Sequence, residues 1–183
     1  MDHFDLGQVY ELLDRYVILN FLVRVLTSHS SRGAEEFNCK LDNIDFELLG
    51  LSDVSVELLK SSPSLRNLKK CHDEIFRLAE EASTSIFGYM VQLSNDEKVV
   101  VKEYVDTMVA DYLTKIGQCQ DTYLNLVVQI DKSTKEENSA TTRALGKLAK
   151  SSFNELYQYN TICQNYSNVS SYLRGMIQNY TKR

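Results

Sequence analysis

Proline and glycine are scarce in this chain, which holds one proline, Pro63, and seven glycines among 183 residues. A β-sheet protein of this length needs many tight turns, and tight turns draw heavily on these two residue types. Long helices connected by few turns do not. The scarcity of turn residues therefore predicts an all-α fold before any periodicity is considered.

Apolar residues recur at helical spacing in four long segments, about 6–28, 65–93, 95–131 and 140–180. Within each segment they follow one another at three- and four-residue steps, which places them on one face of a helix. Val127 of the third segment and Leu148 of the fourth fall on these inward-facing stripes. Ser94 and Glu97 match a capping box, S-x-x-E, so we expect a helix to begin just after Ser94.

The stretch 29–63, between the first and second segments, has a different composition. Residues 34–59 hold seven acidic residues and one basic residue, a formal charge of −6 against −5 for the whole chain. Apolar residues are interleaved with these acids, and short helices are expected near 42–49 and 53–61. We therefore predict a long, acidic and partly helical first connection.

Four amphipathic segments joined by two short connections predict a single helical domain over 1–183, built as an elongated antiparallel four-helix bundle. The pattern leaves open whether 131–139 is a turn or a bent continuous helix. The fourth segment of ~41 residues would reach ~60 Å at 1.5 Å per residue. A compact domain of this length is only ~40 Å across. Part of the fourth helix is therefore expected to extend beyond the body.

Charge, hydropathy and cysteine spacing exclude several classes of protein. A net charge of −5 with only short basic clusters gives no footing for direct nucleic-acid binding. The longest apolar run, 16–26, is too short for a bilayer, which needs ~20 apolar residues. Asp2 and Asp5 replace the basic start of a signal peptide. The four cysteines have neither metal nor redox spacing, so we expect an intracellular protein, cytoplasmic or nuclear.

No catalytic, cofactor-binding or metal-binding constellation is recognisable. His72 lies on an apolar stripe beside Cys71, where a core-edge histidine is a better interpretation than a metal ligand, because a metal site needs several matched ligands. Adjacent helical residues point ~100° apart and cannot pair as nucleophile and base. Gly146 and Lys147 lack the earlier glycine of a phosphate-binding loop. We predict a protein that is not an enzyme and needs no cofactor.

Partner contacts are expected at two places. The end of the overlong fourth helix carries a seam that could continue as a coiled coil with another chain. The acidic connection contains an aromatic-x-x-aliphatic pattern typical of short docking segments. The predicted partner-binding residues are Tyr166, Leu173, Ile177, Tyr180, Phe46 and Leu49.

The leading functional hypothesis is a non-catalytic helical interaction module, an adaptor or structural subunit of a multiprotein complex of the tethering, trafficking or chromosome-associated type. Its partners would be other protein chains, in a hetero- or homo-oligomer formed by helix packing. A pathogen-encoded helical protein that binds a host factor is an alternative. A cofactor-binding bundle centred on His72 and a secreted four-helix signalling protein are further alternatives.

Overall fold

The structure is a computed structural model that describes residues 5–28, 45–62 and 64–181, with residues 179–181 described as backbone only. Every regular element in these ranges is a helix, so the all-α prediction is confirmed. The helices are α1 (Leu6–Ser28), α2 (Phe46–Leu49), α3 (Asp53–Ser61), α4 (Leu65–Lys70), α5 (His72–Gln92), α6 (Asn95–Lys135) and α7 (Ser139–Thr181).

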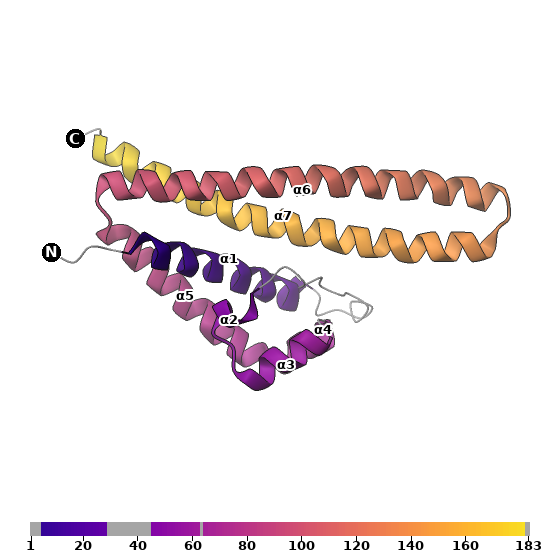
Figure 1. Ribbon diagram of the computed structural model, residues 1–183, viewed down its shortest axis with the longest axis horizontal. Coiled ribbons are helices and arrows are strands. Elements are labelled where there is room, and N and C mark those ends of the chain that lie inside the picture. The colour runs from indigo at the N-terminus through magenta and orange to yellow at the C-terminus, as the bar shows by residue number, and fades with distance from the viewer. Residues whose placement is uncertain (1–4, 29–44, 63, 182–183) are drawn as a thin grey trace.

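Two long antiparallel helices, α6 and α7, form a hairpin that runs the length of the molecule (Figure 1). Their mutual contact is the most extensive between any two helices. The capping box predicted from the sequence is formed at the start of α6: the backbone N–H of Glu97 donates to Ser94 Oγ at 3.1 Å, and Ser94 N–H donates to Glu97 Oε1 at 2.8 Å. These bonds satisfy two backbone donors that a helix start would otherwise leave without partners.

The hairpin turns over three residues, 136–138, so the polar link is a turn and not a bent helix. Glu137 takes a left-handed backbone conformation, with φ 57°. Asn138 then accepts a hydrogen bond from the backbone N–H of Thr141 through Oδ1 at 3.2 Å, which caps the start of α7. Ser133 Oγ lies 2.7 Å from Thr142 Oγ1 and ties the two helices together beside the turn.

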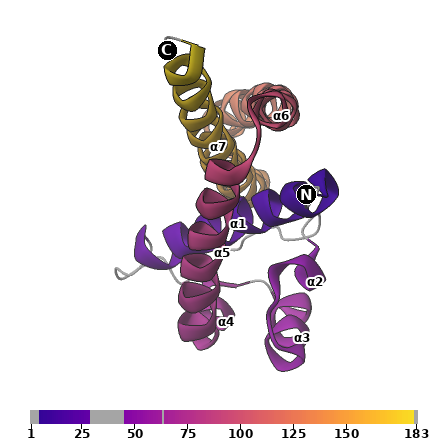
Figure 2. The same ribbon diagram turned by 90° about the vertical axis from the view of Figure 1, so that its left-hand side faces the viewer.

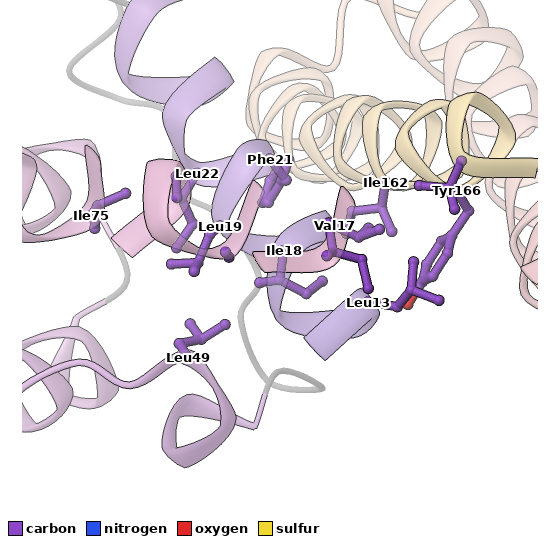
Figure 3. Close-up of a cluster of buried hydrophobic side chains, with 14 of the residues drawn as sticks. Leu13, Val17, Ile18, Leu19, Phe21, Leu22, Leu49, Ile75, Ile162 and Tyr166 are labelled. Carbon is purple, nitrogen blue, oxygen red and sulfur yellow. The ribbon is translucent and has the colours of Figure 1, made fainter. Parts of the chain in front are cut away.

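Helix α1 is the centre of the hydrophobic core. It packs mainly on α5, which crosses it (Figure 2), and also contacts α7, α2, α4 and α6. The apolar face that nearly encircles this helix in the sequence is thus covered from several directions. Figure 3 shows its side chains meeting Leu49 of α2, Ile75 of α5, and Ile162 and Tyr166 of α7. The buried residues of α1 are Val9, Leu13, Val17, Ile18, Leu19, Phe21, Leu22, Val25 and Leu26.

The four-helix bundle topology is not confirmed. Only α6 and α7 pack against each other along most of their length, whereas α1 and α5 gather at one end of this hairpin (Figure 1). The range 65–93, expected as one helix, is divided at Cys71, whose backbone has φ −102° and ψ 10°. The molecule is a hairpin with a helical body attached to one end.

The first connection contributes α2 and α3 to this body. Residues 29–44 of the connection, together with Pro63, lie outside the described residues. Asp45 caps α2 and Ser52 caps α3 through their side chains. Glu74 of α5 anchors α3 from the side, because its carboxylate accepts hydrogen bonds from Ser52 and from Ser55 Oγ. The acidic connection is therefore tied to α5 where the structure describes it.

The core reaches only part of the hairpin. Along α6 it extends from Val101 to Tyr112, and along α7 from Tyr157 to Met176. Beyond these limits lie 113–135 of α6 and 139–156 of α7, which pack on each other and which we call the projecting half. At 1.5 Å per residue, the α6 part rises about 35 Å. Part of the fourth predicted helix does extend beyond the body, but it is the N-terminal part.

No helix in the described ranges combines the length and the apolar character that a bilayer crossing requires.

Candidate functional site

Large apolar side chains are exposed along the projecting half. Leu113, Leu124 and Val128 of α6 are 56%, 60% and 68% exposed, and Leu148 and Phe153 of α7 are 57% and 54% exposed. Together with Val127 they make six of the twelve large hydrophobic side chains found exposed in the described part of the chain. We call these six residues the distal surface. A helix side that leaves so much apolar area in water is typical of an interaction site.

Helical spacing places the α6 members of this surface on one side of the helix. Leu124 follows Leu113 by eleven residues, about three turns, and Val127 and Val128 lie one turn further on. Ile116 and Cys119, by contrast, are buried. The apolar side of α6 is therefore separate from the side that faces α7.

Basic residues lie near the apolar ones on α7. Arg143, Lys147 and Lys150 are all exposed, and their spacing of four and three residues puts them on one side of the helix. Between Ser139 and Asn154 the sequence contains no acidic residue. Residues 139–154 of α7 thus carry a formal charge of +3, although the chain as a whole carries −5.

The contact between the two helices of the projecting half is thin. Its buried side chains are Ile116, Cys119, Ser133 and Ser152, of which Ile116 alone is a large hydrophobic residue. Cys119 Sγ donates to the backbone oxygen of Ser152 at 3.2 Å. Small and polar side chains bury little apolar area, so this half gains less from the hydrophobic effect than the body does.

A cavity of about 570 Å³ lies where the body meets the projecting half. We call it the junction cavity. Helices α1, α2, α6 and α7 and the Asp45 cap contribute to its wall. Its lining residues are Asp14, Ile18, Asp45, Leu48, Leu49, Met108, Tyr112, Lys115, Glu155, Gln158, Tyr159, Ile162 and Tyr166.

Asp14 of α1 is the acceptor of a tyrosine pair at this cavity. Tyr166 Oη donates to Asp14 Oδ1 at 2.6 Å, and Tyr104 Oη lies 2.9 and 2.8 Å from the two carboxylate oxygens. Burial raises the pKa of Asp14 above its ordinary value, and the two tyrosine hydrogen bonds oppose this rise. Burial and the neighbouring Asp14 raise the pKa of Tyr166, so this hydroxyl keeps its proton.

The cavity wall also contains aromatic faces and a lysine. Lys115 Nζ lies 4.8 Å from the centroid of the Tyr112 ring and 5.9 Å from that of Tyr159. Tyr159 Oη donates to Glu155 Oε1 at 2.9 Å. Burial together with this bond raises the pKa of Tyr159 to about 12. An ammonium over a tyrosine face is held by the ring quadrupole.

The residues predicted from the sequence to bind a partner lie in the body. Phe46, Leu49, Tyr166 and Leu173 are buried in its core, and Ile177 is half-buried. Leu49 and Tyr166 also line the junction cavity, which brings two of the six together. Tyr180 is in the last turn of α7 and its side chain lies outside the described residues. Partner binding at these positions stays a prediction.

The distal surface was not found by sequence reasoning. Val127 and Leu148 belong to the inward-facing stripes by spacing, but the structure leaves them 42% and 57% exposed. The usable signal was the width of the apolar pattern: Leu124, Val127 and Val128 together cover more of α6 than a single contacting helix can bury.

The histidine and cysteines singled out in the sequence do not converge. His72 is exposed at the start of α5, stacked on Phe76 and 3.1 Å from Asp73 Oδ1. Cys71, between α4 and α5, Cys119 of α6 and Cys163 of α7 are all buried, and each is a free thiol. In the ranges that the structure covers, no group of three or more His, Cys, Asp or Glu side chains is placed to hold a metal ion.

Comparison with protein-family models, with curated proteins and with solved structures finds no match to this chain.

Proposed function

We propose that this chain is a non-catalytic helical interaction module, an adaptor or structural subunit that binds another protein chain through the distal surface. The observation that carries the proposal is the concentration of six exposed large apolar side chains on the projecting half. Many large apolar side chains exposed on one part of a molecule are costly to leave in water and are typical of protein–protein interaction sites.

The thin packing of the projecting half supports the same proposal. A two-helix hairpin without a third layer buries few side chains, and here the buried set contains a single large hydrophobic residue, Ile116. A partner helix laid along α6 would contact Leu113, Leu124 and Val128 and supply the missing layer. Binding would then stabilise the hairpin as well as join the two chains.

Charge points to an acidic partner. Arg143 and Lys147 are exposed positive groups of α7, close in the sequence to Leu148 of the distal surface. An amphipathic helix with an apolar stripe and acidic flanks would match both features, and complementary charges speed association and select the partner. Cys71, Cys119 and Cys163 are buried free thiols. Free thiols are typical of a reducing compartment, so they support an intracellular setting for the complex.

The test replaces the distal surface without touching the core. In the distal variant Leu124, Val128 and Leu148 are each changed to serine. The matched control changes Val54 and Val91, exposed by 79% and 63% on the body, to serine. Each tagged chain is purified from the cells that produce it, co-purifying proteins are quantified by mass spectrometry, and binding is repeated with the purified partner.

The proposal expects a stoichiometric partner that binds the control like the unchanged chain, loses at least tenfold in affinity for the distal variant, and binds more weakly as salt increases. Equal binding by all three chains, or loss in the Val54 and Val91 control alone, would contradict it. If the partner proves to be a second copy of this chain, the distal surface remains the binding site, but the proposed acidic partner helix is wrong.

A further inference from the structure

We propose that the junction cavity binds a small organic cation, an amine or guanidinium compound with a short hydrocarbon chain. This inference is independent of the distal surface, because the cavity residues and the six distal residues are different sets. It rests on three properties of the cavity wall: its charge, its aromatic faces and its apolar floor.

The charged groups of the wall favour a cation. Three carboxylates, on Asp14, Asp45 and Glu155, face one ammonium, on Lys115. Among the residues that the structure describes, no Lys or Arg forms an ion pair with Asp14, which is bound by tyrosine hydroxyls instead. A half-buried carboxylate held by neutral donors is incompletely compensated, and a cation in the cavity would complete its pairing.

The aromatic faces already hold an ammonium. Lys115 Nζ lies over Tyr112 and Tyr159 at 4.8 and 5.9 Å from their centroids. These two rings are 6.0 Å apart and inclined by 60°, and Tyr166 lies 5.9 Å from Tyr112. Lysine is a long, flexible side chain, and Lys115 belongs to an exposed position of α6. A ligand cation can therefore displace it from the rings.

The floor of the cavity suits a hydrocarbon chain. Ile18, Leu49 and Ile162 are buried residues of α1, α2 and α7 that line it, and Met108 adds a flexible apolar side chain. A volume of about 570 Å³ is within the range of small-molecule sites, ~300–1,000 Å³. The wall thus offers apolar contacts together with two kinds of group that stabilise positive charge, the Asp14 carboxylate and the tyrosine faces.

The test uses spermidine as the probe and 1,8-octanediol as its uncharged counterpart of similar length, titrated calorimetrically into the full chain at 0.15 M NaCl. We expect saturable binding of spermidine and none of the diol. Lys115→Met removes the internal competitor and should tighten binding several-fold, whereas Lys132→Met, on the projecting half, should change nothing. Tyr159→Leu should weaken binding about threefold to thirtyfold, and Tyr159→Phe, which keeps the ring, much less.

Equal binding of spermidine and the diol would overturn the inference. So would equal effects of Lys115→Met and Lys132→Met, which would show general attraction of a polyamine to an acidic protein. If Tyr159→Leu fails to fold, judged by circular dichroism, the two lysine variants and Tyr159→Phe still decide. Acetyl-arginine amide distinguishes the source of the cation. Its binding indicates a side chain of another protein, whereas its exclusion indicates a free amine. Both outcomes are consistent with the proposed cation site.

Discussion

At the scale of single residues, the most consequential group is Asp14. It links α1 to both helices of the hairpin, because Tyr104 belongs to α6 and Tyr166 to α7. A carboxylate in this position loses much of its hydration, and the two hydroxyls replace part of it. These three residues therefore tie α1 to α6 and α7 within the body.

The first prediction concerns the Tyr166 hydroxyl. Tyr166→Phe should lower the free energy of unfolding by about 2 kcal/mol, because a hydrogen bond to a charged group is lost. In the Asp14→Asn background the same change should lower the free energy of unfolding by about 1 kcal/mol, because a hydrogen bond to a neutral acceptor contributes less than one to a carboxylate. Urea denaturation of the four chains measures both values. Tyr172→Phe, which keeps its ring contact with Phe87, is the control. Equal costs in both backgrounds would show that Asp14 is not the relevant acceptor.

The second prediction is the pH dependence of stability at Asp14. Its pKa in the folded chain is raised above 3.8, because of burial. Between the ordinary value and the raised one, the folded state binds more protons than the unfolded state, so stability falls as pH rises through this window. Above it, the contribution of Asp14 is constant. The difference in unfolding free energy between the unchanged chain and Asp14→Asn, measured from pH 3.5 to 7, should decrease with pH. A difference that increases would reverse the assignment.

At the scale of helices, sequence periodicity predicted where long helices lie but not how they divide or pack. The first segment and α1 cover the same residues, and the capping box at Ser94 precedes α6. The interruption at Cys71 has no proline or glycine beside it, so composition offered no signal. The seam from Tyr166 onward was expected to extend outward, yet Leu173 is buried in the body. Which end of a long helix is covered depends on contacts with distant parts of the sequence. One example is the hydrogen bond from Asn165 of α7 to the backbone oxygen of Val17 in α1, 148 residues away. Local spacing does not encode such contacts.

The candidate sites were less accessible to sequence reasoning than the helices. Asp14, Tyr112 and Glu155 come from three helices and share no motif, so the junction cavity follows from tertiary packing alone. The distal surface was hidden for a different reason. Leu124 and Leu148 fit an amphipathic pattern whether a partner helix comes from the same chain or from another.

The third prediction tests the start of α6. Ser94→Ala removes the N-cap acceptor of the Glu97 N–H and should lower the free energy of unfolding by about 1 kcal/mol. Ser85→Ala, at an exposed position inside α5, should change stability by less than about 0.5 kcal/mol. Thermal and urea unfolding of both variants provide the comparison. Equal stabilities would mean that the capping box does not contribute to the hairpin.

At the scale of the whole molecule, two unequal parts follow from where side chains are buried. The body combines α1 to α5 with the parts of α6 and α7 that contact them, and it contains nearly all large buried side chains. The projecting half has exposed Leu113, Leu124 and Leu148 and a seam of small residues. When apolar burial is distributed unevenly along a chain, local stability is distributed unevenly as well. The proposed interaction function depends on this division.

Native-state hydrogen exchange of the purified full chain, resolved by residue and corrected for intrinsic rates, tests the division most directly. Amides of 101–112 and 162–173 should exchange only by global unfolding. Amides of 113–135 and 139–156 should exchange at least about tenfold faster, through opening of the projecting half while the body stays folded. Uniform protection along α6 and α7, at the level of global unfolding, would contradict the account, because the hairpin would then be fully stabilised without a partner.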